Sequence, residues 1–208
     1  AGHSQGGIMA AQLAADPAVR ARYNVVSVVT AGSPTATVAP SDVPVLSYEN
    51  SGDIVPGLQL AHRGFMQGIF VAEEIAGLNP TMQADIDIPR VTFCEPEIAS
   101  VGMTEKQARE KYGDQVRTVE YNLAGNGKSS ILATSGLIKL VSVEGGPIVG
   151  FHGIGARIGE QIGEGELMVN WEAYPSDVAS LIHAHPSQNE SLGEAAMALA
   201  GKPLHVHN

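Results

Sequence analysis

Three strand-like segments follow one another closely in the second half of the chain, and they restrict its fold more than any other feature. They lie at about residues 116–123, 136–143 and 147–154. Glu144-Gly145-Gly146, between the last two, is a turn sequence typical of a β-hairpin. Strands joined by such a short turn run antiparallel. We therefore expect an antiparallel meander as the centre of an α+β unit over residues 88–208.

Helix signals surround this meander. Thr104-Glu105-Lys106-Gln107 is a capping box, which predicts a helix that ends at Gly113. Three further helices are expected at about 156–170, 176–182 and 187–200. Gly163 and Gly165 fall inside the first of these three, and each should weaken it by about 1 kcal/mol.

The first half of the chain has a β/α character. A β-branched run at 24–30 predicts a buried parallel strand, and 44–48 a second short strand. Helices are expected at 8–15 and at 64–76, the second closed by Gly77. With a linker over 80–89, the pattern predicts an α/β fragment at 1–56, a helix and linker at 57–87, and the α+β unit at 88–208.

Charge and cysteine content exclude several classes of protein. The 208 residues carry a formal net charge of −10 without a basic cluster, which argues against nucleic acid and anionic membranes as partners. No apolar run approaches the roughly 20 residues of a membrane span, and no secretory signal or initiator Met opens the chain. We expect it to start inside a larger reading frame, in the cytoplasm. Cys94 is the only cysteine, so an internal disulfide, a cysteine zinc site and a dithiol pair are excluded. We expect Cys94 to be buried, and no metal site.

Gly2-His3-Ser4-Gln5-Gly6 fits the G-x-S-x-G pattern of a nucleophile elbow. Together with the segments that follow, it resembles the lipase and esterase branch of the α/β-hydrolase family over residues 1–56. The resemblance implies Ser4 as nucleophile and Asp53 as the acid of its triad. The favoured alternative is an ordinary terminal serine, because an elbow needs a preceding strand and a histidine partner that the sequence does not provide.

The segment His183-Ala-His185-Pro186-Ser187-Gln188-Asn189-Glu190 holds a candidate general base. Pro186 suits the first position of a helix, and Glu190 would lie in its first turn. From there the Glu190 carboxylate can reach one ring nitrogen of His185, which fixes the tautomer and makes the other nitrogen more basic. The alternative is a simple capping interaction. For His183 we expect a packed or backbone-bonded ring.

From about residue 52 onward the chain resembles the dihydrolipoamide dehydrogenase family, especially its actinobacterial members. The matching segments are GDIVPGLQLAHRGFMQG (52–68), IPRVTFCEPEIASVGMTEKQA (88–108), NLAGNGKSS (122–130), GPIVGFHGIGARIGEQIG (146–163) and NWEAYPSDVASLIHAHPSQNE (170–190). The resemblance covers the end of an FAD-binding domain and a dimerisation domain of the flavoprotein disulfide-reductase type.

The resemblance also implies roles for particular residues. His185 would be the catalytic base and Glu190 its partner, acting on a dithiol of the other subunit in a homodimer. His185 and Pro186 would lie near the flavin of that subunit. Gly52 and Asp53 would bind the FAD ribityl chain, and Leu60, Ala61 and His62 would lie along the flavin ring.

The implied reaction is FAD- and NAD-dependent oxidation of dihydrolipoamide, carried by the lipoyl-bearing acyltransferase of a 2-oxo acid dehydrogenase complex. The chain departs from the family at Glu49-Asn50-Ser51, where an aromatic-Ala-x sequence is usual. It also contains no G-x-G-x-x-G loop and no C-x4-C pair, so we expect it to be inactive alone. Because Gly52-Asp53-Ile54-Val55-Pro56 satisfies both resemblances, it is the expected point of fusion. A serine esterase fragment and a non-catalytic dimerisation module are the alternatives.

Overall fold

The computed structural model describes residues 2–3, 28–31, 45–48 and 60–205, which divide into two compact units. The first unit spans Ala1–Asp85 and the second Ile86–Asn208. Ser4, Gly52, Asp53 and the helix expected at 8–15 lie outside the described residues.

The first unit contains a small parallel sheet. Its strands β1 (Gly2–His3), β2 (Val28–Ala31) and β3 (Val45–Tyr48) lie in the order β1-β2-β3. Val28 pairs with Val45 in the parallel register. The parallel strands expected near 24–30 and 44–48 are therefore present.

Helix α3 (Ala61–Ile75) follows in the same unit and begins three residues before the predicted start. Gly77, with a φ of 74°, stands just beyond its end, as predicted. Arg63 forms an ion pair of 2.9 Å with Asp85, at the start of the 3₁₀ turn η2 (Asp85–Asp87). This pair connects the first turn of the helix to the end of its unit.

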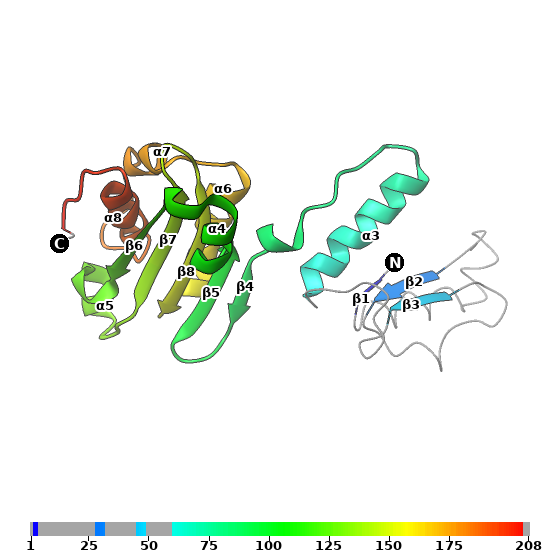
Figure 1. Cartoon of the computed structure of the whole chain (residues 1–208). Coiled ribbons are helices and arrows are strands. Elements are labelled where there is room, and N and C mark those ends of the chain that lie inside the picture. The colour runs from blue at the N-terminus through cyan, green and yellow to red at the C-terminus, as the bar shows by residue number, and fades with distance from the viewer. Residues whose placement is uncertain (1, 4–27, 32–44, 49–59, 206–208) are drawn as a thin grey trace. The chain divides into compact units, whose positions relative to one another are not determined.

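The second unit is built on a five-stranded antiparallel sheet with the order β4-β5-β8-β7-β6 (Figure 1). The strands are β4 (Arg90–Thr92), β5 (Glu97–Gly102), β6 (Val116–Asn122), β7 (Leu137–Val143) and β8 (Ile148–Gly155). The predicted meander of β6, β7 and β8 is confirmed, including its hairpin turn. Strand β5 was not predicted, because its small central residues give a weak local signal and its pairing with β8 comes from a segment about 50 residues further on.

Five helices surround this sheet, with α4 on one face and α6 and α8 on the other (Figure 1). They are α4 (Glu105–Tyr112), α5 (Gly127–Ile131), α6 (Ile158–Asn170), α7 (Pro175–Ala179) and α8 (Glu190–Leu199). The alternation of side chains along β7 explains the two layers. Leu140 packs in the core with Phe151 and Leu192, whereas its neighbour Val141 packs with Ala108 of α4.

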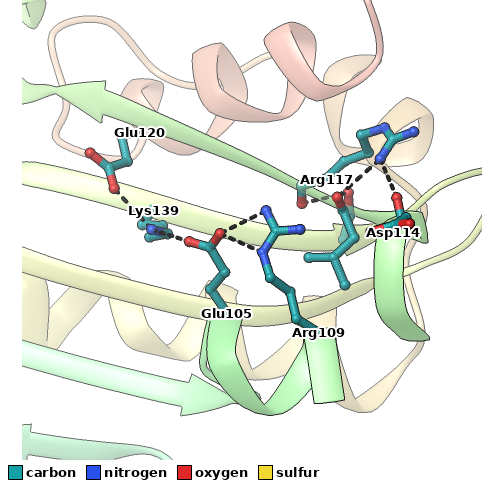
Figure 2. Close-up of polar contacts among 8 residues, drawn as sticks. Glu105, Arg109, Asp114, Arg117, Glu120 and Lys139 are labelled. Atoms are coloured by element: carbon teal, nitrogen blue, oxygen red, sulfur yellow. Dashed lines mark hydrogen bonds and ion pairs between the residues drawn. The ribbon is translucent and has the colours of Figure 1, made fainter. Parts of the chain in front are cut away.

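Polar contacts attach α4 to its face of the sheet (Figure 2). The capping box of Thr104 and Gln107 is formed as predicted. Glu105 then binds both Arg109 and Lys139, and Lys139 also contacts Glu120 of β6 at 2.9 Å. Hydrogen bonds from Lys139 and Arg109 hold the pKa of Glu105 below its ordinary value. These partly exposed pairs orient the helix and add little stability each.

Candidate active site

The candidate base lies on the loop that joins α7 to α8. This loop spans residues 180–189, and α8 begins at Glu190 with Asn189 as its N-cap. The prediction that Pro186 opens the helix is therefore wrong. The Asn126 side-chain amide donates to the carbonyls of Ser187 and Gln188, at 3.2 and 3.3 Å, and these contacts hold the segment after Pro186 outside a helix. The peptide bond between His185 and Pro186 is cis.

His185 and Glu190 form the pair that their spacing predicts. Nδ1 of His185 lies 2.8 Å from Oε1 of Glu190, and the imidazole side chain is 75% exposed. The second carboxylate oxygen of Glu190 accepts a hydrogen bond of 2.8 Å from the Ser187 amide. Because the carboxylate occupies Nδ1, the ring presents Nε2, and within the described part of the chain no group binds that nitrogen.

The pKa of Glu190 lies below its ordinary value. Burial raises this pKa, but the Ser187 amide and the His185 ring bind the ionised form and outweigh the effect of burial. Glu190 also stands in the first turn of α8, where the helix dipole favours a negative charge. The carboxylate thus remains ionised and holds the imidazole in the tautomer with hydrogen on Nδ1.

Gln188 holds the loop of residues 180–189 in place through its hydrogen bonds, a role that the sequence did not predict. Its side-chain oxygen accepts from the Ser129 hydroxyl at 2.9 Å, and its amide donates to the Ala156 carbonyl at 3.0 Å. Its backbone carbonyl accepts from Asn126 and from the Ser191 hydroxyl. Gln188, Asn126 and Ser129 are all buried. The family resemblance includes all three residues, in the segments at 122–130 and 170–190, but gives them no role.

His183, on the same loop, forms a second histidine–carboxylate pair. Its Nε2 lies 2.7 Å from Oε1 of Glu164 on α6, so its partner is a side chain and not the backbone. The hydrogen bond to Glu164 raises the pKa of His183, although burial acts in the opposite direction. Burial raises the pKa of Glu164, but hydrogen bonds from His183 and Asn189 more than offset this, so its pKa lies below the ordinary value.

The other residues singled out in the sequence lie elsewhere. Leu60, Ala61 and His62 form the start of α3 in the first unit, where the His62 ring packs edge-on against Phe65 at 5.3 Å. His185, Pro186 and Glu190 belong to the second unit.

Cys94 is exposed, which corrects the expectation of a buried thiol. It lies in the segment between β4 and β5, outside both strands, where its Sγ donates to the Pro96 carbonyl at 3.0 Å. Among the described residues, no group of three or more His, Cys, Asp or Glu side chains is placed to hold a metal ion. None of their helices has both the length and the apolar character needed to cross a membrane.

An antiparallel sheet covered by helices matches the architecture of the dimerisation domain of flavoprotein disulfide reductases. Residues 88–196 match the family model described as pyridine nucleotide-disulphide oxidoreductase, dimerisation domain. The chain belongs to this family of oxidoreductases.

Its relatives include enzymes named dihydrolipoyl dehydrogenase. The Corynebacterium glutamicum enzyme is 39% identical over 154 residues, which cover 72% of this chain and 33% of the relative. The Geobacillus stearothermophilus enzyme is 40% identical over 157 residues, which cover 74% of this chain and 33% of the relative. The chain thus spans about a third of the length of these relatives, the region that includes their dimerisation domain.

Solved structures share the fold. LpdA from Mycobacterium tuberculosis superposes with a TM-score of 0.66 at 22% identity, covering 76% of this chain and 34% of that one. The flavoprotein disulfide reductase RclA from Escherichia coli superposes with a TM-score of 0.62 at 23% identity, and the match covers 76% of this chain and 36% of RclA. The family match begins at residue 88, and these comparisons do not support a hydrolase fragment at the N-terminus.

Proposed function

We propose that this chain supplies the dimerisation domain and the acid–base pair of an FAD- and NAD-dependent dihydrolipoyl dehydrogenase. The observation that carries the proposal is the exposed His185 ring, held through Nδ1 by Glu190 at 2.8 Å. In this role Nε2 of His185 takes the proton of a substrate thiol, and the Glu190 carboxylate stabilises the resulting imidazolium. The substrate is dihydrolipoamide carried on the acyltransferase of a 2-oxo acid dehydrogenase complex.

A complete FAD site and a complete NAD site would each need residues that this sequence does not contain. This sequence contains neither a G-x-G-x-x-G phosphate loop nor a second cysteine, so its own residues do not make a complete FAD or NAD site. Gly52 and Asp53 remain the candidates for the FAD ribityl chain, with Leu60, Ala61 and His62 beside the flavin ring. We therefore derive only the proton transfer at His185 and assign redox chemistry to the portion of the relatives that this chain does not span.

The proposed enzyme is a homodimer in the cytoplasm. The family name supports dimerisation. From the family resemblance we infer that His185 acts across the dimer interface on a dithiol, which would lie in the portion of the relatives that this chain does not span, because this chain has a single cysteine. The low cysteine content fits a reducing compartment.

A chimera tests the proposal. Residues 88–208 would replace the corresponding part of the C. glutamicum enzyme, and reduction of NAD by dihydrolipoamide would be measured. Loss of a general base costs about 10²–10⁴-fold in rate, so we expect His185→Gln to lower kcat by that much. Glu190→Gln should cost less, because Glu190 orients the ring and does not itself take the proton.

The control for the chimera is His205→Gln. His205 also pairs with a carboxylate of α8, Glu194, at 2.7 Å, but it lies outside the loop of His185. A chimera that dimerises normally and loses less than about tenfold on His185→Gln would reject the catalytic role. A larger loss for Glu190→Gln than for His185→Gln would reverse the two roles.

The isolated chain should not turn over dihydrolipoamide with NAD, because it has no dithiol and no phosphate loop. Turnover by the purified 208-residue chain, persisting in Cys94→Ser, would contradict this architecture.

A serine esterase fragment is the second candidate. The observation that favours it is the parallel, sequential order β1-β2-β3, in which Ser4 comes directly after β1. Hydrolysis of a p-nitrophenyl ester that disappears in Ser4→Ala would support this candidate, and equal hydrolysis by both chains would exclude it.

A further inference from the structure

The ring of His183 is held tightly between two helices. Its Nε2 contacts Glu164 of α6 at 2.7 Å, and its other side lies against Gly193 of α8. A Cβ added at Gly193 would stand only 2.7 Å from Nδ1 of His183, closer than side chains approach. The His183 side chain is 13% exposed, compared with 75% for His185 two residues later.

Glu164 connects this ring to the start of α8. Its second oxygen accepts a hydrogen bond of 2.6 Å from the side chain of Asn189, the residue directly before Glu190. One carboxylate of α6 therefore binds the loop on both sides of His185. The charged groups facing His183 are Glu164 from α6 and Glu190 from α8, and both favour its protonated form.

We propose that His183 is a positioning residue for His185: bound by Glu164 and seated on Gly193, it fixes the loop so that His185 keeps its Nδ1 contact with Glu190. The proposal rests on the proposed function, in which His185 is the base. Asn126 and Gln188 hold the loop after His185, whereas His183 holds it before His185. Without His183 the loop would be held on one side of His185 only, and the contact of its exposed ring with Glu190 would be less well fixed.

The test measures the tautomer of His185 in the full chain by long-range ¹H–¹⁵N correlation spectra. At about pH 8 the wild-type ring should carry its hydrogen on Nδ1 and leave Nε2 free. His183→Ala removes the anchor, while Gly193→Ala keeps every charged group and displaces the His183 ring. In both variants we expect the ratio of the Nδ1–H form to the Nε2–H form of His185 to fall by at least about twofold.

Two matched controls separate positioning from general stability. His205→Gln removes the other histidine–carboxylate pair of α8, and Gly163→Ala adds a methyl group where no atom lies within 4 Å. Neither should change the His185 tautomer. If His183→Ala fails to fold by circular dichroism, Gly193→Ala carries the test.

Two results would overturn the proposal. The first is an unchanged His185 tautomer in a folded Gly193→Ala chain in which the His183 ring no longer contacts Glu164. The second is an equal change of the tautomer in the control variants. The tautomer is read without turnover, so its outcome is independent of the chimera. An active His185→Gln chimera would reject the proposed function and leave the positioning of His185 by His183 intact.

Discussion

At the scale of single residues, the pair of His183 and Glu164 links stability to pH. The pKa of His183 is raised above 6.5, so its contribution is complete below about that pH and is lost as the pH rises through the raised value. The pKa of Glu164 is lowered below 4.5, so its contribution is complete above about that pH and is lost as the pH falls through the lowered value. The pair should stabilise the fold most between these two limits.

We therefore expect His183→Gln to lower the free energy of unfolding by about 1–3 kcal/mol near pH 5.5, and by less near pH 9. Urea denaturation of both chains at the two pH values measures the difference. A loss that is the same at both would show that the charge of His183 does not contribute.

At the scale of elements, two of the three glycines inside α6, Gly163 and Gly165, serve different purposes. Both should weaken an isolated helix, as the sequence predicts, yet α6 runs through them from Ile158 to Asn170. A Cβ at Gly165 would lie 2.8 Å from the ring of Phe151, a fully buried core residue of β8, whereas Gly163 faces open space. Gly165 therefore lets the helix approach the sheet closely.

Gly163→Ala should raise the free energy of unfolding by about 0.5–1 kcal/mol, because alanine favours the helix. Gly165→Ala should lower it by about 1–3 kcal/mol, because the added methyl overpacks the core. Urea midpoints compare the two variants directly, and equal stabilisation by both would contradict this view of the packing between α6 and β8.

At the scale of the whole molecule, we expect the chain to dimerise through surface near the His185 loop. Ile182 is 100% exposed and Leu181 60% exposed, and large apolar side chains exposed together mark interaction surfaces. Ile182→Asp should weaken dimerisation at least about tenfold in Kd, since a charge would be buried without a partner. Ile75→Asp, on exposed α3, is the control.

Light scattering at micromolar concentration measures the assembly. A wild-type chain that remains monomeric would contradict the prediction. Equal weakening by both substitutions would place the interface away from Ile182.

The sequence by itself determined the features that depend on near neighbours. The hairpin between β7 and β8, the capping box at Thr104 and the contact between His185 and Glu190 each join residues close in the chain, where spacing and residue type decide geometry. The tertiary structure decided the rest. Strand β5 exists because β8 pairs with it, and α8 starts at Glu190 and not at Pro186 because Asn126, 61 residues away from Ser187, binds the loop carbonyls. The partner of His183, on another helix, is likewise set by how α6 and α8 pack, which no local pattern contains.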